Sequence, residues 1–204
     1  VFLTTLGLIS ARAQVCYGNL NVKFGGAYCG MSDALDGATH HATEDIAVMR
    51  ALPNMTVLVP SDATSTRWAT KYAVDTYGPM YLRLSRDVYP DLYDENTKFE
   101  CGKGAIVRDG TDVTVIACGI LVHKALEAAE QMAARGVSVR VVDMYSIKPI
   151  DRVLAWGGTG APTEFVGIAD TFTETGKYTD LLAKYGVDAA GVVRGIERVL
   201  ARKH

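Results

Sequence analysis

The sequence is poor in several features that would each have pointed to a class of protein. It has four cysteines and no Cys-x-x-Cys pair, so neither a disulfide-stabilised secreted fold nor a thiolate metal site is indicated. No apolar run approaches the roughly 20 residues that a membrane-spanning helix requires. The formal net charge is only -2 and no Lys/Arg-rich run occurs, so we expect neither nucleic acid nor a membrane as a partner.

The composition that is present suits a globular α/β protein. Of its 204 residues, 49% are hydrophobic and 22% are charged, which is enough to bury a core in one or two units. The first ten residues have neither a basic leader nor a cleavage site typical of a signal peptide. Together with the free thiols, this predicts a cytoplasmic protein. The chain begins at Val1 inside a helical pattern, so we expect it to start partway through a domain.

Helical and strand patterns alternate along the chain, which is typical of parallel sheets covered by helices. The predicted fold class is therefore α/β, with two consecutive three-layer α/β units and mostly parallel sheets. We place the first unit at residues 1–90, a polar, turn-rich linker at 91–103 and the second unit at 104–204. The expected helices cover 3–17, 42–52, 61–78, 120–136, 177–186 and 188–203, and the expected strands cover 21–27, 55–59, 79–86, 112–119, 137–144 and 164–170.

Titratable residues are concentrated in the loop GMSDALDGATHHATED, residues 30–45. In open α/β sheets, ligands collect at the carboxyl ends of strands, and Arg86 follows another strand of the same unit. This predicts one site containing Asp36, His40, His41 and Arg86. Simpler readings stay open: Asp36 in a turn, either histidine at a helix entry, Arg86 in a surface ion pair. The adjacent histidines have no third ligand at a recognisable spacing, so we predict no metal site on this chain.

The run DGATHHATEDIAVMRALPNMTVLVPSD, residues 36–62, resembles the pyrimidine-binding domain of the transketolase family. PMYLRLSR, residues 79–86, resembles the family's strand that ends in a substrate-binding arginine. Residues 102–151 and 168–186 resemble its C-terminal domain, so the resemblance covers nearly the whole chain. In size the chain looks most like the C-terminal subunit of a split, two-chain transketolase. The matching motif positions are Asp36, Gly37, Thr39, His40, Glu44, Asp45, Ile46, Ala47, Arg50, Leu52, Pro53, Asn54, Pro60 and Asp62.

The resemblance implies an enzyme that uses thiamine diphosphate and Mg²⁺ to move a two-carbon ketol unit from a ketose, often a sugar phosphate, to an aldose. It implies that His40 contacts the substrate and moves protons, while Asp36 binds the donor sugar's hydroxyls with His41 beside it. By the same resemblance, Arg86 clamps an anionic tail, and Phe2 packs on the aminopyrimidine ring. Glu44 and Asp45 would brace the helix entry.

Several positions depart from the family pattern. Tyr28 stands where the family commonly has a substrate-binding histidine, so the anion recognised here could differ from phosphate. Leu35 replaces a glutamate, and the family's cofactor-activating glutamate would lie upstream of Phe2, before this chain begins. Between residues 155 and 162 the family has a further strand, loop and helix, so we expect residues to be missing there.

The chain lacks the family domain that holds the diphosphate and the metal. We therefore expect an N-terminal transketolase subunit as partner, carrying most of the Mg²⁺ site, and a homodimer of such pairs, that is, a heterotetramer. Two other readings stay open: a 2-oxoacid dehydrogenase β chain or deoxyxylulose-phosphate synthase-like enzyme, and a non-catalytic transketolase-like scaffold. Retention of Asp36, His40 and Arg86 argues against the scaffold, because a scaffold needs none of them.

Overall fold

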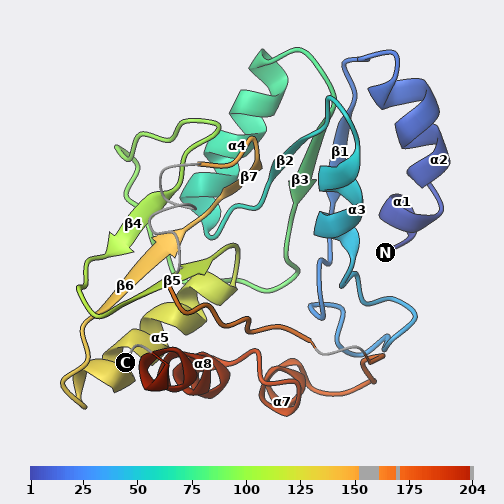
Figure 1. Cartoon of the computed structure of the whole chain (residues 1–204). Helices are drawn as coiled ribbons and strands as arrows, with labels where there is room; N and C mark the ends of the chain where they lie inside the picture. The colour runs from blue at the N-terminus through green and yellow to red at the C-terminus, as the bar shows by residue number, and fades with distance from the viewer. Residues whose placement is uncertain (152–160, 169–170, 203–204) are drawn as a thin grey trace.

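The structure, a computed structural model, describes residues 1–151, 161–168 and 171–202. Two sheets lie side by side, each with helices packed on it (Figure 1). Most neighbouring strands are parallel, so the predicted α/β class with mostly parallel sheets is confirmed. The residues expected to be missing at 155–162 fall largely outside the described ranges. None of the described helices is long and apolar enough to cross a membrane.

The first sheet has the strand order β1-β3-β2-β7. β1, β3 and β2 are parallel, and β7 from the second half of the chain pairs antiparallel with β2. Its strands are β1 (Lys23–Gly26), β2 (Thr56–Leu58), β3 (Met80–Arg83) and β7 (Ser146–Lys148). The elements flanking it are α1 (Phe2–Thr5), α2 (Leu8–Ser10), the π-helical turn η1 (Ala11–Cys16), α3 (Asp45–Ala51) and α4 (Ala63–Asp75).

Alternating side chains of this sheet build two different cores, as strand geometry requires. Val57 and Tyr81 face the N-terminal helices and α3, where they pack with Met49. Leu58 and Met80 face α4 on the opposite side. Both faces of the sheet are therefore covered, which explains the nearly continuous apolar runs in its strands.

The second sheet has the order β4-β6-β5, with β5 and β6 parallel and β4 antiparallel to β6. Helices α5 and α8 pack together on one face of it, against Val139 and Val141. The sequence did not indicate β4 or β7, which are short and carry polar residues. The elements are β4 (Ala105–Arg108), β5 (Val113–Ala117), α5 (Leu121–Ala133), β6 (Val139–Asp143), α7 (Tyr178–Lys184) and α8 (Ala189–Ala201).

Two sequence-based expectations about elements are wrong. The helix expected over 3–17 is divided into α1, α2 and η1. The break falls at Gly7, where a Cβ would lie 2.5 Å from the Leu3 carbonyl oxygen, so only glycine allows this close turn. The strand expected over 164–170 is absent from its described part, 164–168, where no neighbouring strand pairs with it and Phe165 is exposed.

A buried carboxyl lies where the two sheets meet. Asp143, at the end of β6, is fully buried and accepts a hydrogen bond from the Tyr93 hydroxyl at 2.8 Å. Its other oxygen, Oδ1, has no hydrogen-bond partner among the described residues. Burial raises the pKa of the Asp143 carboxyl from 3.8 to about 7, and the nearby Asp62 carboxylate adds to the increase. This group therefore takes up a proton on folding at mildly acidic pH.

This protonation predicts a pH dependence of stability. The folded chain keeps the Asp143 proton up to about pH 7 and the unfolded chain releases it near 3.8, so its contribution is full below 3.8 and lost as pH rises to 7. We expect Asp143→Asn to flatten this dependence, by ~3 kcal/mol of unfolding free energy between about pH 4.5 and pH 8. Urea unfolding at both pH values measures it, with exposed Asp75→Asn as control. Parallel curves for wild type and Asp143→Asn would contradict it.

Candidate functional site

The titratable loop is fastened to the carboxyl end of the first sheet. The Cys29 amide donates to the Leu84 carbonyl just beyond β3, at 3.1 Å. Gly30 and Ala42 exchange two backbone hydrogen bonds of 3.0 Å and so close the base of the loop. Tyr28 begins the loop in a left-handed conformation with φ 58°. An aromatic residue rarely adopts this conformation, and it costs ~1–3 kcal/mol that the surrounding contacts must offset.

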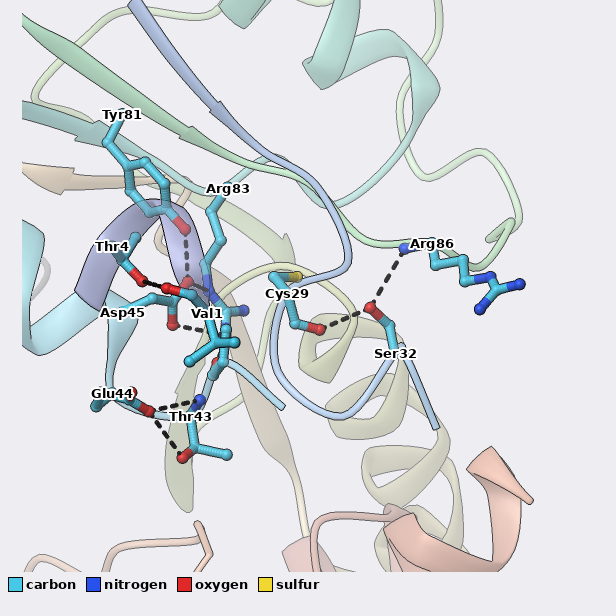
Figure 2. Close-up of polar contacts among 11 residues, drawn as sticks. Val1, Thr4, Cys29, Ser32, Thr43, Glu44, Asp45, Tyr81, Arg83 and Arg86 are labelled. Atoms are coloured by element: carbon cyan, nitrogen blue, oxygen red, sulfur yellow. Dashed lines mark hydrogen bonds and ion pairs between the residues drawn. The ribbon is translucent and has the colours of Figure 1, made fainter. Parts of the chain in front are cut away.

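A buried ion pair anchors the other end of the loop. Asp45, the first residue of α3, is fully buried and binds the Arg83 guanidinium through both carboxylate oxygens, at 2.7 and 3.1 Å. The Tyr81 hydroxyl donates to the same carboxylate at 2.7 Å, and Arg83 also reaches the Ala42 carbonyl at 3.3 Å. Figure 2 shows Tyr81 and Arg83 directed at Asp45 from β3. This network fixes the point at which the loop enters α3.

A segment of the second unit holds the middle of the loop. The Thr173 hydroxyl lies 2.6 Å from His41 Nδ1, and His41 Nε2 lies 3.3 Å from the Asp33 carbonyl. Gly37 has φ 76°, and a Cβ there would lie 2.3 Å from the Thr175 hydroxyl oxygen. Burial lowers the pKa of His41, which favours the neutral ring that these two contacts require. Both ring nitrogens of His41 are thus engaged by the protein, away from a substrate.

A cavity of about 290 Å³ lies between the loop, β1 and α1. Phe2 and His40 meet in it edge to face, with ring centroids 5.1 Å apart. His40 Nδ1 lies 3.0 Å from the Thr39 hydroxyl, so Nε2 is the ring nitrogen available to a ligand. The lining residues are Val1, Phe2, Leu3, Thr4, Gly25, Gly26, Ala27, Tyr28, Asp33, His40, Ala42 and Tyr81.

Arg86 lies at the rim of the loop and is held there by three contacts. Its Nη1 forms an ion pair with Asp33 at 2.7 Å. Its guanidinium carbon lies over the Tyr28 ring, 5.1 Å from the centroid. Its backbone nitrogen donates to the Ser32 hydroxyl at 3.3 Å, and Ser32 donates to the Cys29 carbonyl (Figure 2). The guanidinium is therefore oriented before any ligand binds, although half of the side chain is exposed.

The structure brings together only part of the set that the sequence proposed. Phe2, Tyr28 and His40 line one cavity. Asp36 lies exposed on the turn of the loop and does not line this cavity, and Arg86 stands at the rim.

Two features of the site were missed by the sequence reasoning. Asp33 lines the cavity and pairs with Arg86, and its only sequence signal is its position three residues before Asp36 in the same loop. The pairing of Asp45 with Arg83 links residues 38 positions apart, and nothing in their spacing indicates it. In the part of the chain that the structure describes, no three His, Cys, Asp or Glu residues are grouped as metal ligands would be.

Known families match both halves of the chain. Residues 2–91 match the pyrimidine-binding domain of transketolase, and residues 102–156 match the transketolase C-terminal domain. One of the two subunits of the apulose-4-phosphate transketolase of Phocaeicola vulgatus is 33% identical, over 95% of this chain and 72% of the relative. The chain belongs to the transketolase family. It contains two of that family's domains, in the family's order.

Other relatives agree with this membership. The "Putative transketolase C-terminal section" of Methanocaldococcus jannaschii is 35% identical over 91% of this chain and 68% of its own length. A solved structure described as "Split gene transketolase, inactive beta4 tetramer" superimposes with a TM-score of 0.87 and 37% identity, covering 100% of this chain and 75% of the other. The transketolase of Pichia stipitis, at 19% identity and TM-score 0.77, shares the fold.

The cavity suits the ring end of thiamine diphosphate, the cofactor of this family. Its walls are the Phe2 ring and the bare backbone of Gly25 and Gly26, which is a shape for a flat heterocycle. A Cβ at Gly26 would lie 2.5 Å from the Tyr81 ring, so this wall cannot carry a side chain. No lysine or arginine lines the cavity, which leaves no cationic side chain here to bind a diphosphate. The residues present therefore fit one half of the cofactor.

Proposed function

We propose that this chain is the C-terminal component of a split transketolase, moving a two-carbon ketol unit from a ketose to an aldose with thiamine diphosphate. The observation that carries the proposal is the half-site: Phe2 and His40 meet in a cavity that suits a heterocyclic ring but offers no cationic side chain for a diphosphate and no ligand cluster for Mg²⁺ among the described residues. The names of the relatives, one a transketolase subunit and the other a C-terminal section, support a partner for this chain as well.

Each residue of the site has a defined task in this proposal. The cofactor supplies the carbanion chemistry when it is bound. His40 Nε2 faces the reacting end of the sugar and exchanges a proton with its hydroxyl or carbonyl oxygen, which a neutral imidazole can do near pH 7. Phe2 packs on the cofactor ring and fixes the edge of His40. Asp36 on the loop turn accepts hydrogen bonds from sugar hydroxyls, and Arg86 binds the far end of the sugar.

The partner supplies what this chain lacks. An N-terminal subunit would hold the diphosphate and Mg²⁺, and two such pairs would form a heterotetramer. The exposed apolar side chains on α1 and α2, Leu6 and Ile9, each 80% exposed, are available to such a partner. Glu44 and Asp45 serve structure in this scheme, because Asp45 is buried in its ion pair.

Reconstitution tests the proposal. The full natural chain is mixed with the product of the neighbouring reading frame, thiamine diphosphate and Mg²⁺, and two-carbon transfer from a panel of ketoses to a labelled aldose is followed by mass. We expect transfer only when both chains are present. Decarboxylation of a 2-oxoacid without ketol transfer would indicate the 2-oxoacid dehydrogenase branch. Assembly without either reaction would indicate a scaffold.

A further inference from the structure

The site holds an unusual balance of charge around Arg86. Two arginines follow one another near the end of β3, and each already has a carboxylate partner. Arg83 is bound to buried Asp45, and Arg86 is bound to Asp33. The Asp33 side chain is only 9% exposed, so solvent screens its charge poorly. Since the cavity is lined by Asp33 and by no lysine or arginine, its side chains do not favour a second anion.

Tyr28 strengthens this balance rather than changing it. Its ring lies under the Arg86 guanidinium and stabilises the cation by a cation–π contact. Its hydroxyl can donate one hydrogen bond but carries no charge near neutral pH. Asp33 and Tyr28 together fix the plane of the guanidinium and use one of its edges, leaving the remaining N–H groups for hydroxyl oxygens of a ligand.

A phosphate group would meet an unfavourable field here. It carries close to two negative charges at neutral pH, and to reach Arg86 it must approach the Asp33 carboxylate, which is itself 2.7 Å from the guanidinium. Repulsion between like charges at such short range is strong in a partly buried site. Sugar hydroxyls meet no such repulsion, and Asp33 can accept a hydrogen bond from them.

We propose that Asp33 is a specificity-determining residue: paired with Arg86 above Tyr28, it makes the site select sugars whose far end carries hydroxyl groups and reject a phosphate dianion. This inference rests on the proposed ketol-transfer function. It assigns to Asp33 a role that motif positions do not indicate.

The test compares one acceptor with and without phosphate. The assembled two-chain enzyme is given an uncharged ketose donor, L-erythrulose, with either D-ribose or D-ribose 5-phosphate. We expect the wild type to favour D-ribose in kcat/KM, and Asp33→Asn to shift the ratio toward the phosphate by ~10-fold to 100-fold, mainly through KM. Asp75→Asn removes the same charge from an exposed ion pair on α4 and should leave the ratio unchanged.

The outcomes separate the inference from the proposed function. If transfer occurs but Asp33→Asn leaves the ratio unchanged, the inference is wrong and the function stands. A complete lack of transfer in the wild type contradicts the function itself. Binding of inorganic phosphate, measured by calorimetry, then decides the charge argument without turnover. We expect tighter binding by Asp33→Asn than by wild type, lost again when Arg86→Gln is added; equal binding by wild type and Asp33→Asn would overturn it.

Discussion

Replacing His40 with alanine should lower kcat for ketol transfer by ~10²-fold to 10⁴-fold, the usual loss when a positioned proton-transfer group is removed. His40 is the residue whose free ring nitrogen faces the cavity beside Phe2. The side chain is partly exposed and contributes only the Phe2 edge contact and the Thr39 hydrogen bond to the fold. Assembly with the partner and the melting temperature should therefore change little, which separates a chemical defect from a folding defect.

The measurement is steady-state transfer by the reconstituted enzyme, with size-exclusion chromatography to check assembly. His123→Ala is the matched control, because that histidine bonds the Ser61 carbonyl at 2.8 Å and does not line the cavity. We expect His123→Ala to retain transfer within about threefold, since changes outside a site have small effects. Full activity of His40→Ala would remove the proton-transfer role and return weight to a scaffold.

The largest expected loss of stability follows from removing Asp45. In Asp45→Ala, Arg83 is left as an uncompensated buried cation and Tyr81 loses the acceptor of its hydroxyl, both at the junction of β3 and α3. Breaking a buried pair in this way costs ~3–5 kcal/mol, because the remaining charge stays desolvated. The loop between Tyr28 and Glu44 should loosen first, since this network fixes its end.

Urea unfolding and amide hydrogen exchange measure this effect. Glu44→Ala is the matched control: it is one residue earlier, is exposed and bonds only Thr43, so we expect a change of less than about 0.5 kcal/mol. Tyr81→Phe should fall between the two, at ~1 kcal/mol for one lost hydrogen bond. If Asp45→Ala and Glu44→Ala unfold at the same urea concentration, the ion pair does not hold the loop.

The local pattern was sufficient for the parts of the fold that depend on neighbouring residues. Runs of apolar residues predicted the parallel strands β1, β2 and β3, and amphipathic periodicity predicted α4, α5 and α8. Short polar β4 and β7 could not be predicted in this way. β7 pairs with β2 across about 90 residues of sequence, and such pairing depends on where the units dock. The failed strand at 164–168 shows the reverse: a strand-like pattern forms no strand without a partner.

The candidate site divides in the same way. The sequence by itself determined its family, through the motif around Asp36 and His40, because these residue types recur at fixed spacing within one loop. Only the tertiary structure decided that Phe2 meets His40 and that His41 turns toward Thr173. It also decided that Asp33 neutralises Arg86. These contacts join residues from 38 to 132 positions apart, and their distances depend on how the loop, β3 and the second unit pack together.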